Sequence, residues 1–271
     1  MRWVVAVAWF AAIAVLGLSA CSQKALVYER ALDDGQSFTA YLVSYQSSGL
    51  KVYAMVAVPK AAMPAAGFPV VVANHGYVPE PTKYGITADG VDSRPGDYYR
   101  SVPELYTSRG FLVVLPDYRG HNSSEGLEFT GTPESVDYYA DDVITLLGML
   151  HELQQSDMNN VFMWSHSMGG AVSLRAMLAT DMIKGASFWS TMPVGDTLAE
   201  HGLPEVPVIL HHAVGDASTA SSNSQVFAEA LKAGGRTYTF HSYDGAEHYF
   251  EGAVRELAAD RDAEFFGLLS K

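Results

Sequence analysis

Four short runs of almost wholly apolar residues limit the fold of this chain more than any other feature of its sequence. The runs cover residues 70–73, 111–115, 161–164 and 208–210. Continuous rather than alternating hydrophobicity indicates strands that are covered on both faces, as in a parallel sheet. Between and after these runs, residues 135–153, 168–179, 221–233 and 255–269 show the spacing of amphipathic helices. Strand followed by helix, repeated, predicts an α/β fold with a doubly wound, mostly parallel sheet.

Two runs closer to the N-terminus predict a different kind of strand pairing. Residues 38–45 and 50–58 are rich in β-branched and aromatic side chains, and they are separated by Ser47, Ser48 and Gly49. This pattern predicts an antiparallel hairpin ahead of the parallel sheet. No internal repeat, low-complexity tract or interdomain linker interrupts the sequence that follows. We therefore expect one domain over residues 37–271.

The composition excludes several classes of protein and of partner. With 48% apolar and 17% charged residues, the chain is neither disordered nor a coiled coil. Its formal net charge of -13 argues against nucleic acid as a partner, because acidic surfaces repel phosphate groups. A chain of 271 residues buries enough surface to fold without disulfides or a structural metal. The single cysteine could not form an internal disulfide.

The first 20 residues are typical of a targeting segment. Residues 3–16 contain no polar side chain and follow Arg2. A membrane-spanning helix needs roughly 20 apolar residues, whereas the apolar region of a secretory signal peptide needs roughly 7 to 15. Residues 18–21, Leu-Ser-Ala-Cys, resemble the bacterial lipobox, whose cysteine is lipidated and becomes the first residue of the mature protein.

This resemblance predicts where the protein is located. Residues 1–20 would be a lipoprotein signal peptide, Cys21 the lipidated membrane anchor, and residues 21–36 a tether. The protein would then lie in the bacterial cell envelope, and Ser22 after the cysteine favours the outer membrane. The alternative is an uncleaved membrane anchor in which Cys21 has no role.

The clearest chemical motif follows the third of the four apolar runs. Residues 161–164 lead into Ser165-His166-Ser167-Met168-Gly169-Gly170 and then into an Ala- and Leu-rich helix. Strand, tight turn and helix are the context of a nucleophile elbow, in which a serine lies on a strained turn with small neighbours two residues away on each side. Ser165 stands where such elbows usually have glycine. The alternative is an ordinary helix N-terminus capped by Ser165 or Ser167.

A serine nucleophile needs a base and an acid. Asp216 follows the apolar run at residues 208–210, and His248 follows a further predicted strand at residues 238–240. Ser167, Asp216 and His248 come in the order Ser, acid, His that is typical of α/β hydrolases. The separations of 49 and 32 residues allow one strand–helix unit between successive members. We therefore predict that these three side chains meet at the carboxyl edge of the sheet.

At this point the chain resembles a known family. The Ser-His-Ser-Met-Gly-Gly elbow and the segments at residues 212–216 and 243–248 are similar to α/β hydrolases of the prolyl-oligopeptidase and dienelactone-hydrolase type. Residues 74–77, Asn-His-Gly-Tyr, and 116–123, Pro-Asp-Tyr-Arg-Gly-His-Asn-Ser, resemble two more motifs of that fold. The similarity extends over roughly residues 50–265. Asn122 and Ala213 replace glycines that are usual in the family.

The resemblance implies a role for each site residue. Ser167 attacks a carbonyl carbon, His248 is the general base, and Asp216 orients and supports the imidazole. The backbone N–H groups of Met168 and Tyr77 form the oxyanion hole. The motif implies no cofactor and no metal.

Other candidates have structural interpretations beside the functional ones. Asp196 is the rival catalytic acid, because it follows a sixth predicted strand near residues 186–189. His166 either lines the pocket or is solvated. The remaining polar candidates are expected to support turns and loops or to pack behind the site: His75, Asp117, Arg119, Asp141, Asp142, His211 and His212.

The substrate is the least determined property. Residues 190–206 leave room for only a small cap, and about 250 mature residues leave no room for the accessory domain of prolyl oligopeptidases. The insertion at residues 78–99 predicts either a pocket wall for an acyl or aryl group or a surface loop held by buried tyrosines. We expect a carboxylic ester, with an amide or short peptide as the alternative, and a non-catalytic lipoprotein that uses the scaffold for binding as the third possibility. The oligomeric state is left open.

Overall fold

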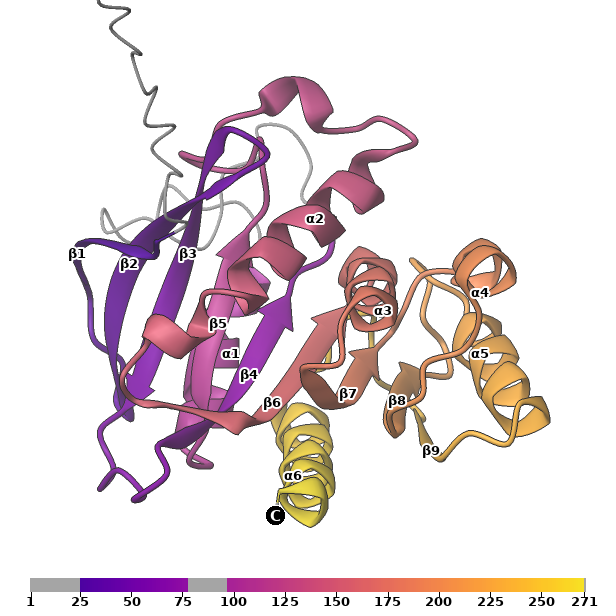
Figure 1. Ribbon diagram of the computed structural model, residues 1–271. Coiled ribbons are helices and arrows are strands. Elements are labelled where there is room, and N and C mark those ends of the chain that lie inside the picture. The colour runs from indigo at the N-terminus through magenta and orange to yellow at the C-terminus, as the bar shows by residue number, and fades with distance from the viewer. Residues whose placement is uncertain (1–24, 78–96, 271) are drawn as a thin grey trace, which may run out of the picture.

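The computed structural model describes residues 25–77 and 97–270. Nine strands of this part form one sheet in the order β1-β2-β3-β5-β4-β6-β7-β8-β9 (Figure 1). Strands β1, β2, β3 and β5 pair antiparallel, and β5, β4 and β6 to β9 pair parallel. The predicted α/β-hydrolase type of sheet is therefore confirmed. The strands are β1 (Val27–Leu32), β2 (Phe38–Ser47), β3 (Leu50–Pro59), β4 (Phe68–Asn74), β5 (Leu112–Asp117), β6 (Ser156–His166), β7 (Ile183–Trp189), β8 (Val208–Ala213) and β9 (Tyr238–Tyr243).

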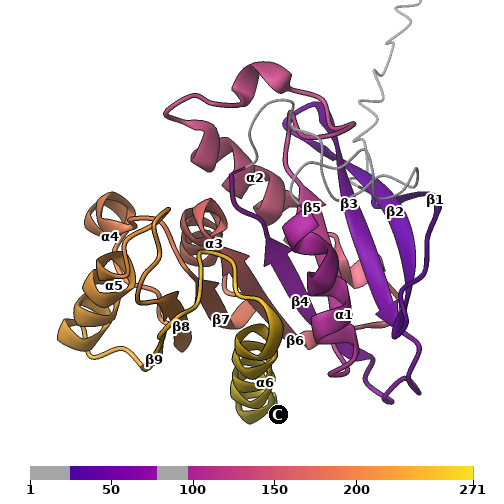
Figure 2. The ribbon, with the colours of Figure 1, turned by 180° about the vertical axis from the view of Figure 1, so that it is seen from behind.

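Helices cover both faces of this sheet, which explains the continuous apolar runs. Helices α2, α3 and α5 pack on one face, and α1 and α6 pack on the other, as the view from behind in Figure 2 shows. Along β6, Val161 and Met163 belong to the first core, while Phe162 and Trp164 belong to the second. The helices are α1 (Ser101–Thr107), α2 (Ser135–Leu147), α3 (Met168–Ala179), α4 (Gly195–His201), α5 (Ser222–Ala233) and α6 (Gly252–Leu269).

The predicted hairpin is confirmed as β2 and β3, but the tether predicted over residues 21–36 is wrong in part. Strand β1 lies inside that segment and pairs antiparallel with β2. An edge strand is held by its backbone hydrogen bonds and tolerates charged side chains, so its hydrophobicity gives a weak signal. Glu29 is one such side chain, and it accepts a hydrogen bond from Ser44 at 2.6 Å. Cys21 and the predicted signal peptide lie outside the described residues.

The helix predicted over residues 135–153 is shorter than expected. Helix α2 ends at Leu147, and a separate 3-10 turn covers Leu150–Glu152. Gly148 caps the helix, and glycine is a poor helix former because it loses more backbone freedom than other residues. The other three predicted helices agree with the structure within three residues at each end. No helix in residues 25–77 and 97–270 is both long and apolar enough to span a membrane.

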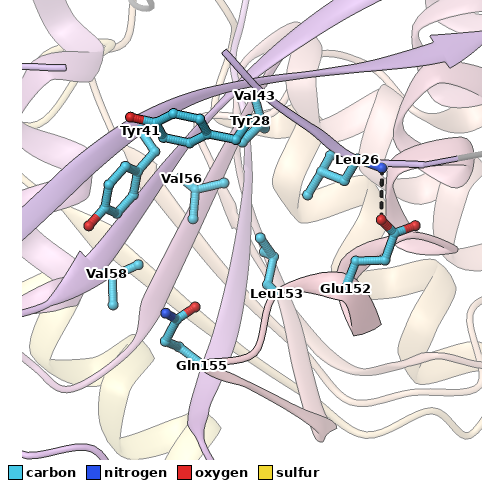
Figure 3. A pocket seen from close by; sticks show the side chains of 9 residues that line it. All are labelled: Leu26, Tyr28, Tyr41, Val43, Val56, Val58, Glu152, Leu153 and Gln155. Carbon is cyan, nitrogen blue, oxygen red and sulfur yellow. Dashed lines mark hydrogen bonds between the residues drawn. The ribbon is translucent and has the colours of Figure 1, made fainter. Parts of the chain in front are cut away.

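A shallow groove lies beside the N-terminal strands (Figure 3). Strands β1 to β3 form one side, and the turn after α2 forms the other. The Glu152 carboxylate accepts the backbone N–H of Leu26 at 2.9 Å, which holds the start of β1 against that turn. The groove shares no lining residue with the candidate active site. Its lining consists of Leu26, Tyr28, Tyr41, Val43, Val56, Val58, Glu152, Leu153 and Gln155.

Candidate active site

Ser167 lies on a sharp turn between β6 and α3. Its backbone angles are φ 56° and ψ -122°, a conformation that side-chain-bearing residues rarely adopt. The surrounding structure holds this strain in place, since the Ser167 N–H donates to the carbonyl of Trp189 at 3.0 Å. The Ser167 carbonyl in turn accepts the N–H groups of Gly170 and Met192. This geometry matches the predicted nucleophile elbow and not an ordinary capped helix start.

The small residues of the motif are required by close packing. A Cβ at Gly169 would overlap the carbonyl oxygen of Asn74 and lie 2.7 Å from that of His75. Ser165 is fully buried, and its hydroxyl donates to the carbonyl of Ser187 at 3.1 Å. Because that hydroxyl has a partner, serine is accommodated where related elbows carry glycine.

Asp216 and His248 are in direct contact. Nδ1–H of His248 donates to Oδ2 of Asp216 at 2.8 Å. The other carboxylate oxygen accepts the backbone N–H groups of Ser218 and Thr219 at 2.8 and 2.9 Å. Donation from Nδ1 leaves Nε2 of a neutral imidazole as a proton acceptor, which is the tautomer that a general base needs.

The hydrogen bonds of Asp216 also set its charge state. Burial raises the pKa of Asp216, but the hydrogen bonds from His248, Thr219 and Ser218 outweigh burial and hold the pKa below its ordinary value. The carboxylate is therefore ionised at neutral pH and can support a positively charged imidazole. Its side chain is fully enclosed, whereas that of His248 is 23% exposed.

Ser167 lies at the same edge of the sheet as His248, and its neighbour His166 contacts His248. Nε2–H of His166 donates to the backbone carbonyl of His248 at 2.9 Å, and the two imidazole rings lie 4.6 Å apart. No direct hydrogen bond joins the Ser167 hydroxyl to the His248 ring in the described part of the chain. Catalytic hydrogen bonds are often long without substrate and shorten when it binds.

Asp196, the rival acid, lies elsewhere. It is exposed in the first turn of α4. The contact with His248 is made by Asp216 instead. The structure therefore favours Asp216 as the partner of the histidine.

One predicted oxyanion donor directly follows Ser167, and the other lies in the loop after β4. Met168 is the first residue of α3, where backbone N–H groups lack partners within the helix. Tyr77 follows Gly76, and a Cβ built on Gly76 would lie 3.0 Å from Cβ of Ser167. The backbone after β4 thus runs past the serine. The Tyr77 side chain is 63% exposed.

The sequence left the role of His166 open and gave no indication of a role for Thr219. His166 is buried rather than solvated, and its Nδ1 accepts a hydrogen bond from the Tyr99 hydroxyl at 2.9 Å. Thr219 places its hydroxyl 3.0 Å from Oδ2 of Asp216. Tyr99 is buried, as the interpretation of a loop held by tyrosines predicts, while residues 78–96 of that insertion lie outside the described part.

The remaining polar candidates have structural contacts. His75 is buried and stacks on Tyr118 with ring centroids 4.0 Å apart. The Arg119 guanidinium forms a buried ion pair with Asp142 at 2.6 Å. His211 and His212 point to opposite sides of β8: the former contacts Asp262 and Tyr243, and the latter contacts Ser224 and Thr219. No group of acidic, histidine or cysteine side chains suited to a metal ion is found among the described residues.

Comparison with known proteins gives matches at the level of sequence and of fold. The family model of the serine aminopeptidases, S33, matches residues 86–197, a segment that includes Ser167 and ends before Asp216. The solved structure of a Mycobacterium tuberculosis puromycin-hydrolyzing peptidase superimposes with a TM-score of 0.65 at 21% identity, over 91% of this chain and 39% of the peptidase. The chain thus spans about two fifths of that peptidase. No curated protein matches the sequence.

Two further solved structures are similar over most of their own length. Est1E from Butyrivibrio proteoclasticus, solved with ferulic acid, has a TM-score of 0.62 at 16% identity, over 83% of this chain and 98% of Est1E. Acetyl xylan esterase 1 from a Thermoanaerobacterium species has a TM-score of 0.64 at 14% identity, over 89% of this chain and 88% of the esterase. The chain has the α/β-hydrolase fold. The segment matched by the family model includes the strained turn at Ser167.

Proposed function

We propose that this α/β hydrolase is an extracytoplasmic enzyme that cleaves carboxylic esters through an acyl-enzyme on Ser167. The observation that carries the proposal is the Asp216–His248 hydrogen bond at the same sheet edge as the strained serine. His248 Nε2 takes the proton of the Ser167 hydroxyl while Oγ attacks the ester carbonyl. The N–H groups of Met168 and Tyr77 stabilise the resulting oxyanion.

Collapse of this intermediate breaks the bond to the leaving alkoxide. His248 returns the proton to that oxygen, so the first product is an alcohol and the serine is acylated. Water then attacks the acyl-enzyme, with His248 again as the base, and the carboxylic acid leaves. Asp216 keeps Nδ1 protonated and stabilises the imidazolium that forms in both steps.

The preference for esters rests on the extent of the structural similarity. Est1E and acetyl xylan esterase 1 are matched over 98% and 88% of their lengths, whereas the puromycin-hydrolyzing peptidase is matched over 39%. Between β7 and β8 the chain forms a single short helix, α4, which leaves little chain for a cap and suits an open pocket for a small acyl group.

A peptidase is the second candidate, because the matching family model is that of serine aminopeptidases. The same three residues would acylate with an amine leaving group instead of an alcohol. A p-nitrophenyl ester and a p-nitroanilide of one acyl group separate the two. We expect the ester to have the higher kcat/KM even after correction for the uncatalysed rates. An aminoacyl anilide that is cleaved faster after this correction would assign a peptidase.

The role of Ser167 is tested by Ser167→Ala. Loss of the nucleophile should lower kcat by on the order of 10⁶ and abolish labelling by a fluorophosphonate. Ser222→Ala, at an exposed position in α5, is the matched control and should keep both. Ester hydrolysis by Ser167→Ala at the parental rate would refute the mechanism. A parent chain that hydrolyses no ester and takes up no fluorophosphonate would favour the non-catalytic binding role.

The location belongs to the proposal as well. The Leu-Ser-Ala-Cys sequence at residues 18–21 supports lipidation of Cys21, which would hold the enzyme on a membrane of the cell envelope. Metabolic labelling with an alkyne palmitate tests this, since Cys21→Ala should lose the label and leave the membrane fraction.

A further inference from the structure

A chain of hydrogen bonds links three loops around Ser167 through two buried side chains. The backbone N–H of Gly76 lies 2.8 Å from the Tyr99 hydroxyl, and this hydroxyl lies 2.9 Å from Nδ1 of His166. Nε2 of His166 lies 2.9 Å from the backbone carbonyl of His248. The chain therefore joins the loop after β4, the elbow after β6 and the loop after β9.

The direction of each hydrogen bond follows from the groups involved. A carbonyl only accepts, so Nε2 of His166 carries the proton that points to His248. Burial lowers the pKa of His166 to about 3, so the ring is neutral near pH 7 and Nδ1 is an acceptor. The Tyr99 hydroxyl must then donate to Nδ1, and its oxygen accepts the N–H of Gly76. All three bonds form together in a single tautomer of His166.

The rings of this chain also pack tightly. His166 lies 4.6 Å from the His248 ring and 5.2 Å from the Tyr249 ring, and Tyr99 lies 5.9 Å from Tyr249. Both His166 and Tyr99 are only 2% exposed. Because both side chains are so little exposed, the loss of one partner leaves a buried polar group unpaired and costs more than it would in solvent.

We propose that Tyr99 and His166 are positioning residues that set the distance between the nucleophile, the base and the oxyanion loop. His166 is next to Ser167 in the chain and holds the backbone of His248. Tyr99 holds Gly76, the residue directly before Tyr77. The inference rests on the proposed function, because it assigns these contacts to the same reaction.

Tyr99→Phe tests the inference with the smallest change, since it removes one hydroxyl and keeps the ring. We expect kcat for an activated ester to fall about 10- to 100-fold, because small displacements of reacting groups have effects of this size. KM should stay nearly unchanged. Tyr45→Phe is the matched control, because Tyr45 is also buried and its hydroxyl has no hydrogen-bond partner in the described part of the chain. Parental kcat in Tyr99→Phe would overturn the inference.

His166→Gln provides a second and independent variant. The glutamine amide can still donate to the His248 carbonyl but cannot accept from Tyr99 at the position of Nδ1. If Tyr99 and His166 act through their shared bond, the double variant should lose little more activity than the more damaged single variant. Losses that multiply would show separate effects and contradict the proposed chain.

A transition-state mimic distinguishes positioning from a general loss of structure. A trifluoromethyl ketone forms a tetrahedral adduct with an active serine, so its affinity should fall in Tyr99→Phe by the same factor as kcat/KM. The affinity of the matching methyl ketone, which forms such an adduct far less readily, should hardly change. Equal losses for both ketones would reject positioning.

The tautomer of His166 can be tested without any activity. In ¹⁵N-histidine NMR spectra of the full chain at pH 7, we expect His166 to be protonated at Nε2 alone, and Tyr99→Phe to shift its Nδ1 resonance. A proton on Nδ1 would overturn the chain of hydrogen bonds even if the enzyme is active. If His166 has this tautomer but no fluorophosphonate labels the chain, the proposed function is refuted. The catalytic role of these contacts is then refuted with it.

Discussion

Gly169 is the residue whose replacement most directly disturbs the nucleophile elbow. Alanine there would push its Cβ into the Asn74 carbonyl oxygen and place it 2.7 Å from that of His75. Both obstacles are backbone atoms, which cannot rotate away. We expect Gly169→Ala to destabilise the fold by about 1–3 kcal/mol and to lose most activity, measured by urea unfolding and ester hydrolysis.

Gly267 provides the matched control for this substitution. It lies in α6, and a Cβ there meets nothing within 4 Å. Alanine in a helix interior is favoured over glycine by roughly 0.5–1 kcal/mol. Gly267→Ala should therefore unfold at slightly higher urea and keep full activity. A Gly169→Ala enzyme that behaves in the same way would show that the elbow is not tightly packed.

Asp216 determines which nitrogen of His248 carries the proton. Asparagine in its place can present an N–H to Nδ1 and favour the wrong tautomer, so we expect Asp216→Asn to lower kcat by about 10⁴. The fold should persist, because the residue stays close to isosteric. Asp196→Asn, in the exposed first turn of α4, is the control and should keep near-parental kcat. A larger loss from Asp196→Asn would reassign the acid.

The sequence carries enough information to predict some of these residues and not others. Ser167, Asp216 and His248 each follow an apolar run, and carboxyl ends of parallel strands meet at one edge, so their placement could be expected. Tyr99 is 67 positions from His166 and belongs to no periodic pattern. Its hydrogen bond depends on how the loops fold back, which local sequence does not specify.

At the scale of elements, a buried ion pair joins the loop after β5 to helix α2. The side chains of Arg119 and Asp142 are 3% and 0% exposed. Asp142→Asn would leave the guanidinium buried without its counter-charge, so we expect a loss of about 3–5 kcal/mol in the free energy of unfolding. Asp141→Asn, at an exposed neighbouring position, should change it by less than about 0.5 kcal/mol.

Unfolding of both variants in guanidinium chloride measures their free energies of unfolding and separates these outcomes. Helix α2 packs against α3, so we expect α2 to unfold together with the rest of the domain. Activity should therefore fall only as far as the folded fraction falls. Equal stability of Asp142→Asn and Asp141→Asn would show that Arg119 finds other partners or reaches solvent.

The interior strands of the sheet were easier to predict from the sequence than the strand at its edge. Strands β4 to β8 must be apolar on both sides because helices cover both, and this requirement is visible in the sequence. Strand β1 covers the edge of the hairpin with mostly exposed side chains, so neither alternation nor apolar runs marked it. Helix α2 ends just before Gly148, and the spacing of apolar residues from which the helix was predicted takes no account of this glycine.

At the scale of the whole molecule, buried neutral histidines couple stability to pH. Burial lowers the pKa of His166 to about 3 in the folded chain, against an ordinary value of 6.5. Between these values the unfolded chain binds one more proton at this position than the folded chain does. The contribution of His166 to the free energy of unfolding is therefore fully present above about pH 6.5 and declines as the pH falls toward 3. Burial likewise lowers the pKa of His75, His121 and His212.

His166→Gln removes a group that takes up a proton on unfolding. The free energy of unfolding should therefore depend less steeply on pH. Each proton taken up on unfolding contributes about 1.4 kcal/mol per pH unit to the slope of the unfolding free energy. We expect urea unfolding at pH 4, 5 and 6 to give a slope that is smaller by about this amount in His166→Gln than in the parent, whatever the change in absolute stability. Asp216, whose pKa is lowered, contributes in the same direction but only at more acidic pH. Identical slopes would mean that His166 is protonated in the folded chain, and a charged ring could not accept the hydrogen bond from Tyr99.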